Sequence, residues 1–290
     1  MIRDEGGTTM MTTTTIRAAM VGSALLAAAS LPAQAQDMKT VSQSRALAGE
    51  ETLDVQIVYG AGVLSVGPAE GGVLYALDLR YDERQFEPMT RFSENRLEVG
   101  VEGRGRNIDL DDDDDGQLDL KLAPGLPMDL RLEFGAGRAT VDLGGLALRD
   151  LDIETGASES RIRVSRPNPQ VLRRAEFNVG AADFEATRLA NLNLEELSVN
   201  AGVGRVALDF SGTLRRDLEV DVDMGLGSLE LRVPEGVGVR IEKSSFLTSF
   251  DADGFIRRDG VYYSADWDSA TRRIMVDVTA AFGSISVERS

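Results

Sequence analysis

Apolar and polar residues alternate along most of the chain from residue 53 onward. Leu130, Leu132 and Phe134, for example, alternate with Arg131 and Glu133. Because successive side chains of a strand point to opposite faces of a sheet, such a run predicts a strand with one apolar and one charged face. No stretch keeps a period of 3.6 residues, so we predict little helix.

Seven of these runs break at a step of small residues and then restart. The steps are Gly60-Ala61-Gly62, Gly135-Ala136-Gly137, Gly156-Ala157-Ser158, Gly180-Ala181-Ala182, Gly202-Val203-Gly204, Gly225-Leu226-Gly227 and Ala281-Phe282-Gly283. Counted at the third residue, the five steps from 137 to 227 lie 21, 24, 22 and 23 residues apart. A fixed period of this length is typical of stacked repeats, each of which buries its apolar face against its neighbours.

The pattern therefore predicts an all-β fold, a parallel β-solenoid (β-helix) of about seven rungs. Glycine suits the steps because it accepts positive φ and close approach of another backbone. A Greek-key sandwich with glycine-rich turns is the alternative.

The period fails in two places. Residues 53–128 predict an N-terminal β elaboration with an inserted hairpin region, and the repeat domain is expected over 129–290. The second gap, 243–272, concentrates aromatic residues: Phe246, Phe250, Phe255, Tyr262, Tyr263 and Trp267. Since the open end of a repeat column needs protection, they predict an aromatic C-terminal cap. A platform for stacking sugars, built from the two tyrosines and the tryptophan, is the alternative.

Residues 1–35 are typical of a secretory signal peptide. Arg17 precedes an apolar run over 18–31, and Ala33-Gln34-Ala35 fits a small-x-small cleavage site. The run has 14 residues, whereas a membrane-spanning helix needs about 20. We expect cleavage before Gln36, a flexible leader over 36–52, and a mature chain without a membrane span in the periplasm or on the cell surface. Translation from Met10 or Met11 would give a more regular signal.

Charge and composition restrict the candidate functions. The formal net charge of −17 and a pI near 4.5 disfavour binding to nucleic acid or to anionic lipid. The sequence contains no Cys and no His, which excludes disulfides, thiol nucleophiles, Ser-His-Asp triads and nearly every zinc site. Any enzyme built from this chain would depend on carboxylates, Arg, Tyr or a Ser–Lys pair.

The longest acidic run supplies the main metal hypothesis, and Asp251-Ala252-Asp253-Gly254 is a weaker one. Asp111, Asp113, Asp115, Gly116 and Asp119 match positions 1, 3, 5, 6 and 9 of a calcium loop. At the twelfth position, where a bidentate Glu belongs, the chain has Leu. A short aspartate-rich calcium loop and a solvated hairpin tip are therefore the two interpretations, and no other cofactor is expected.

Several motifs together resemble a known family. These are the Gly-Ala-Gly steps, Val237-Gly238-Val239 after Pro234-Glu235-Gly236, and the closing Phe282-Gly283-Ser284-Ile285. They resemble the bacterial toast-rack family and the C-terminal domain of the cell-wall-active antibiotic response (LiaF-like) proteins, over roughly residues 53–290. The resemblance implies a β-solenoid in the cell envelope, with relatives tied to envelope-stress sensing or called adhesin-like. It implies no catalytic residues. Stress-response relatives typically carry an N-terminal membrane-spanning region, whereas here a cleavable signal is expected.

The sequence thus predicts a non-enzymatic, exported cell-envelope protein that presents acidic strand faces to an envelope protein or a surface polymer. It would act as a binding or scaffold module in envelope-stress sensing or adhesion. The alternative is a carbohydrate-active enzyme, a polysaccharide lyase or glycosidase, with Asp221 and Asp223 or the Arg215-Arg216-Asp217 corner as its polar groups. Self-association through the ends of the column is a third hypothesis.

Overall fold

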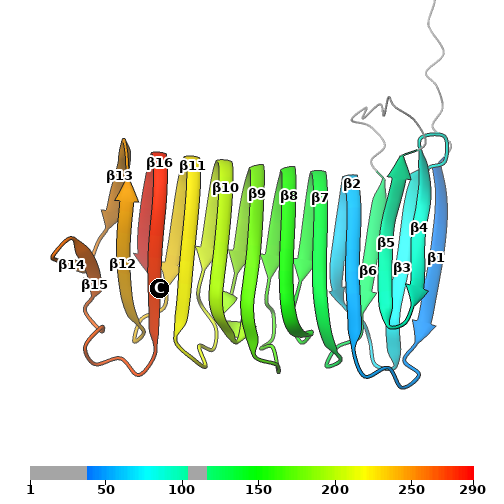
Figure 1. Cartoon of the computed structure of the whole chain (residues 1–290), viewed down its shortest axis with the longest axis horizontal. Helices are drawn as coiled ribbons and strands as arrows, with labels where there is room; N and C mark the ends of the chain where they lie inside the picture. The colour runs from blue at the N-terminus through cyan, green and yellow to red at the C-terminus, as the bar shows by residue number, and fades with distance from the viewer. Residues whose placement is uncertain (1–37, 104–115) are drawn as a thin grey trace, which may run out of the picture. The chain divides into compact units, whose positions relative to one another are not determined.

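A computed structural model describes residues 38–103 and 116–290. Within these residues, seven strands of 16 or 17 residues form the body of one sheet (Figure 1). They are β2 (Leu53–Pro68), β7 (Pro127–Asp142), β8 (Ala147–Arg163), β9 (Leu172–Thr187), β10 (Leu194–Asp209), β11 (Leu218–Val233) and β16 (Arg273–Arg289). Neighbours pair in parallel, and each strand contains one of the seven small-residue steps. The predicted parallel solenoid of about seven rungs is confirmed.

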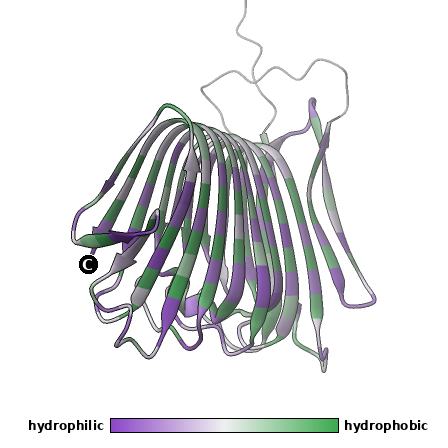
Figure 2. Ribbon diagram, turned by 60° about the vertical axis from the view of Figure 1, so that its left-hand side comes forward, coloured by the Kyte–Doolittle hydropathy of each residue, from purple (hydrophilic) through white to green (hydrophobic). Residues whose placement is uncertain are grey.

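Each long strand bends at its step and continues on the other side of the core (Figure 2). Gly137 has φ +107°, and a Cβ there would lie 2.2 Å from the carbonyl oxygen of Gly62 on the next rung. Gly204 repeats this geometry against Ala182, at 2.0 Å. Gly137 and Gly204 are therefore required both by their backbone conformation and by the close stacking of the rungs, whereas β8 and β9 carry Ser158 and Ala182 at this position without a positive φ. We call the residues before the step the first half of a rung and those after it the second half.

The apolar faces of the two halves enclose one continuous core. Within β9, Phe177 from the first half and Phe184 from the second are fully buried, and their ring centroids lie 5.5 Å apart. Buried asparagines join the rungs at the corners, where the 3-10 helix η1 (Leu189–Leu192) also lies. The Asn191 side chain donates to the carbonyl of Val164 (3.0 Å) and accepts from the backbone N–H of Thr213 (2.9 Å).

At the N-terminal end the column continues as a split rung. β5 (Arg96–Gly103) pairs with the first half of β2, and β6 (Gln117–Leu122) pairs with its second half. β4 (Phe86–Ser93) adds to β5, and β3 (Val73–Asp82) adds to β6. These antiparallel additions form the hairpin region that the sequence predicts between the first two steps.

Two boundaries from the sequence need correction. β1 (Met38–Ala46) pairs with β3 along its whole length, so most of the expected flexible leader over 36–52 is an edge strand. Both faces of this strand are largely exposed, and an edge strand of this kind has no apolar alternation to reveal it. Likewise, β2 is the first full rung, so the repeats begin at 53 and not at 129. The predicted signal peptide, 1–35, lies outside the described residues.

The C-terminal end is closed by β12 (Gly238–Ser245), β13 (Thr248–Ala252), β14 (Phe255–Arg258) and β15 (Val261–Ser264). The last strand of the chain, β16, lies between β11 and β12, so an earlier segment forms the terminal rung (Figure 1). Phe250, Phe255 and Tyr262 pack against the core there, with the rings of Phe250 and Tyr262 4.5 Å apart. The predicted aromatic cap is confirmed. The other three aromatics do not pack against this core: Phe246 is exposed, and the half-buried rings of Tyr263 and Trp267 meet edge to face, with centroids 5.4 Å apart.

The described part of the chain contains no helix that is long and apolar enough to cross a membrane.

Candidate binding surface

Outward-facing side chains of the first halves form one side of the column, which we call the first flank. On β11 and β16 this flank carries Glu219, Asp221, Asp223 and Asp277, which we call the acidic patch. Asp221 and Asp277 are direct register neighbours. None of the four forms an ion pair within the described residues, so like charges face each other at the spacing of adjacent strands, about 4.8 Å.

The electrostatics of the acidic patch follow from this arrangement. Partial burial, with the nearby charges of Asp277, Glu196 and Asp223, raises the pKa of Asp221. Asp150, in β8 on the same flank, has its pKa raised by burial and by Asp129 and Asp152. Such carboxylates gain from a cation supplied by a partner.

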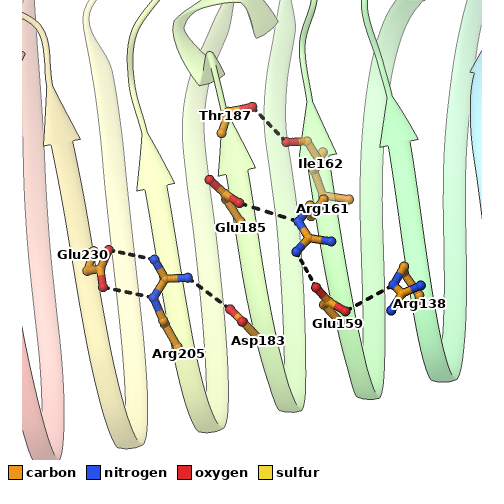
Figure 3. Close-up of polar contacts among 9 residues, drawn as sticks. All are labelled: Arg138, Glu159, Arg161, Ile162, Asp183, Glu185, Thr187, Arg205 and Glu230. Atoms are coloured by element: carbon orange, nitrogen blue, oxygen red, sulfur yellow. Dashed lines mark hydrogen bonds and ion pairs between the residues drawn. The ribbon is translucent and has the colours of Figure 1, made fainter.

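The second flank, formed by the outward residues of the second halves, has the opposite organisation. Arginines and carboxylates alternate between successive rungs and pair with one another (Figure 3). Arg205 lies between Asp183 (3.2 Å) and Glu230, to which it makes two bonds of 3.0 and 2.9 Å. Hydrogen bonds from Arg205 lower the pKa of Glu230.

The same ladder continues toward the N-terminal rungs. Arg138 and Arg161 both bond to Glu159, and Arg161 also reaches Glu185 at 3.9 Å. Bonds from Arg138 and Arg161 lower the pKa of Glu159. The second flank is therefore neutralised within the protein itself, whereas the acidic patch is not.

A groove of about 1080 Å³ crosses the first flank near its N-terminal rungs. Its arginines are mostly paired with neighbouring aspartates, as in Arg96–Asp54 at 2.7 Å and Arg149–Asp129 at 2.6 Å. Arg173 also lines this groove and forms no ion pair among the described residues. Most of the arginines that line the groove therefore have their charge already paired with carboxylates of the sheet.

The residues proposed for catalysis are not brought together. Asp221 and Asp223 lie on one open strand face. Arg216 bonds to Glu195 (2.6 Å) and Asn193 (3.1 Å), and Asp217 accepts from the backbone N–H of Arg273. The Arg215-Arg216-Asp217 corner therefore connects rungs to one another.

The calcium hypothesis remains a prediction. Asp111, Asp113 and Asp115 lie outside the described residues. Asp119 lies on β6, beside Asp78 of β3, and pairs with Lys121 at 3.1 Å. Among the residues that the structure describes, no group of three or more acidic side chains has the geometry to hold a metal ion.

One exposed apolar surface was not predicted from the sequence. Exposed apolar residues follow the bend through the C-terminal rungs: Val203, Leu226, Phe282, Phe246 and Leu247. The signal was present in the middle residue of each step, which is Ala in the first four steps and Val, Leu and Phe in the last three. It was overlooked because the steps were compared by their glycines.

Stacked rungs in register, with a capped C-terminal end and open flanks, define a β-solenoid. The chain belongs to the toast-rack family. The family model described as the N-terminal domain of toast_rack, DUF2154, matches residues 32–185 and 168–232. The resemblance noted in the sequence is thereby confirmed.

Two solved structures are similar to this chain. One is titled a "putative cell adhesion protein" of Clostridium sporogenes, with 20% identity over 87% of this chain and 100% of that chain, and a TM-score of 0.44. The other is a "putative adhesin" of Bacteroides fragilis, with 10% identity over 86% and 97% of the two chains, and a TM-score of 0.41. No curated protein matches the chain.

Proposed function

We propose that this protein is a non-enzymatic binding or scaffold module of the cell envelope, exported to the periplasm or cell surface. In this proposal it binds an envelope protein or a surface polymer through the first flank. The observation that carries the proposal is the acidic patch, whose four carboxylates form no ion pair within the described residues. The nearby cation that acts on Asp221 is Arg174, which is itself paired with Glu196 at 3.6 Å. The second flank pairs its charges internally.

A binding role accounts for this contrast better than catalysis does. Acid–base catalysis by carboxylates needs two groups converging on a substrate in a cleft. Asp221 and Asp223 share an open strand face instead, and most arginines of the groove on the first flank are paired with carboxylates of neighbouring strands. A flat charged face suits a macromolecular partner, which supplies the opposite charge over several rungs.

Export and an envelope location are supported by the signal-peptide features of residues 1–35 and by the family. Envelope-stress sensing and adhesion both require a surface that binds a partner, and they differ in what is bound. Cell fractionation of the tagged full chain tests the location. The export proposal fails if the chain stays in the cytoplasm at full length.

In-cell crosslinking of the tagged chain, with mass spectrometry of the captured molecules, tests the binding role. The informative variant combines Asp221→Asn, Asp223→Asn and Asp277→Asn and so removes three charges from the acidic patch. We call it the acidic-patch variant. We expect it to fold and to lose most of the captured partner.

A matched control removes three charges from the second flank by Asp183→Asn, Glu185→Gln and Glu288→Gln. It should retain the partner. Equal loss in both variants would show that only net charge matters and would contradict a role for the first flank. Turnover of a polysaccharide by the purified chain, abolished in the acidic-patch variant, would instead favour the enzyme.

A further inference from the structure

The outward position at the bend changes character along the column. It is occupied by Ala61, Ala136, Ala157 and Ala181 in β2, β7, β8 and β9, and then by Val203, Leu226 and Phe282 in β10, β11 and β16. The last three are direct register neighbours. Phe246 and Leu247, in the turn between β12 and β13, extend the row. We call these five apolar residues the bend ridge.

The bend ridge is open to solvent. The exposed fractions are 51% for Val203, 50% for Leu226, 44% for Phe282, 65% for Phe246 and 72% for Leu247. The rings of Phe246 and Phe282 meet edge to face, with centroids 5.9 Å apart. Since alanine fills the same position in four rungs, stacking does not require a large side chain there. The contiguous apolar row is therefore available for binding.

A groove of about 670 Å³ runs beside the ridge on the first flank. Met224 and Ala280 lie along its floor, Phe246 borders one end, and Asp223 lines it from the acidic patch. Apolar and acidic surfaces thus lie side by side on β11 and β16, and the apolar row extends further, onto β10 and the turn between β12 and β13. Adjacent rungs are about 4.8 Å apart, so the strip has the length of a short extended segment of four or five residues.

We infer that the bend ridge and its groove bind a basic amphipathic segment of a partner protein. The apolar side chains of the segment pack on the ridge, and its lysines or arginines pair with Asp221, Asp223 and Asp277. Charge complementarity selects this occupant: a second copy of the chain or an anionic membrane would bring negative charge against the acidic patch. The inference rests on the proposed function and names its partner chemistry.

The test uses the purified full chain and two fluorescent probes. One is a peptide of alternating Leu and Lys, and the other replaces each Leu by Ser at the same charge. Fluorescence anisotropy should show that the Leu–Lys peptide binds about tenfold or more tightly than the Ser–Lys peptide. Equal binding of the two peptides would overturn the inference, because the ridge would then contribute nothing.

The decisive variant is Val203→Ala, Leu226→Ala and Phe282→Ala, which gives the last rungs the residue already present in the first four. It should fold, as thermal melting will show, and bind both peptides equally. Phe246→Ser, in an exposed turn, is an independent variant. It should weaken binding of the Leu–Lys peptide and leave binding of the Ser–Lys peptide unchanged. Unchanged preference for Leu–Lys in both variants would contradict the proposal.

The acidic-patch variant should bind both peptides more weakly, and its affinity should depend less on salt concentration than that of the wild type. Two results would show that the bend ridge binds something other than a peptide segment and would overturn the inference. One is binding to neutral vesicles in place of the peptides, and the other is a dimer in sedimentation that the triple alanine variant abolishes. If a partner is captured in cells and the triple alanine variant still captures it, only this inference fails. If nothing is captured in cells while the peptide preference holds, the proposed function fails.

Discussion

The two flanks of the column are built from the same strands with the same alternation, yet their electrostatics differ. On the second flank, Arg205 meets a carboxylate on each neighbouring rung. On the first flank, Asp221 meets Asp277. The difference arises from the register of the strands. The charge of an outward side chain is neutralised only if its register neighbour on the next rung has the opposite charge, and that neighbour lies some twenty to fifty residues away in the chain.

This comparison separates what stabilises the fold from what is available for binding. Exposed ion pairs contribute about 0–1 kcal/mol each, so the ladder on the second flank is a small part of stability. The core and the glycine bends carry the architecture. The acidic patch can therefore remain unpaired, because its repulsion is small beside the stability that the core provides.

The largest effect is expected from a change that breaks both flanks at once. In Gly137→Ala, the new Cβ would lie 2.2 Å from a backbone oxygen, and the left-handed backbone adds strain of about 1–2 kcal/mol. We expect the free energy of unfolding, from chemical denaturation, to fall by about 2 kcal/mol or more. Gly60→Ala, where nothing lies within 4 Å of the added Cβ, is the control. Equal losses in the two variants would refute the role of the bend.

A smaller effect should come from breaking the second flank alone. Arg205→Met removes the cation between Asp183 and Glu230, and should lower the free energy of unfolding by about 1 kcal/mol or less. Arg215→Met, at an exposed corner where the structure gives Arg215 no ion pair, should change it by less. A double-mutant cycle with Glu230→Gln measures the coupling directly. A coupling of zero would show that the ladder is not a source of stability.

The smallest effect distinguishes the flanks by its sign. Asp221→Asn relieves repulsion, so it should raise the free energy of unfolding at pH 7 by a few tenths of a kcal/mol. The wild-type carboxyl has a raised pKa and protonates as the pH falls, so this gain should disappear in acid.

Glu230→Gln should do the opposite. The pKa of Glu230 is lowered in the folded chain by its hydrogen bonds from Arg205, so its stabilising contribution is present above the ordinary glutamate pKa of 4.5 and is lost as the pH falls through the folded value. The variant should therefore be less stable at pH 7 and approach wild type in acid. Urea denaturation of both variants between pH 7 and 3 checks the pair. The same sign for both would contradict the comparison.

Sequence patterns predicted the strands and bends because both are local. Period-two alternation marks the core face of each rung, and each bend is marked by three adjacent residues that are mostly small. Three features were not local. The polar strand β1 has little buried face to reveal it, β16 inserts between β11 and β12 without any sequence signal, and the pairing of Asp221 with Asp277 follows only from that insertion.

The central claim is that the first flank, and not the second, receives a partner in the cell envelope. The most direct measurement places a photo-crosslinking amino acid at 219 or at 232 in the full chain. These two exposed positions lie on the same strand, β11, but on opposite flanks. The account predicts a discrete adduct with a cell-envelope molecule from position 219 and none from 232. An adduct from 232 alone, or equal adducts from both positions, would contradict it.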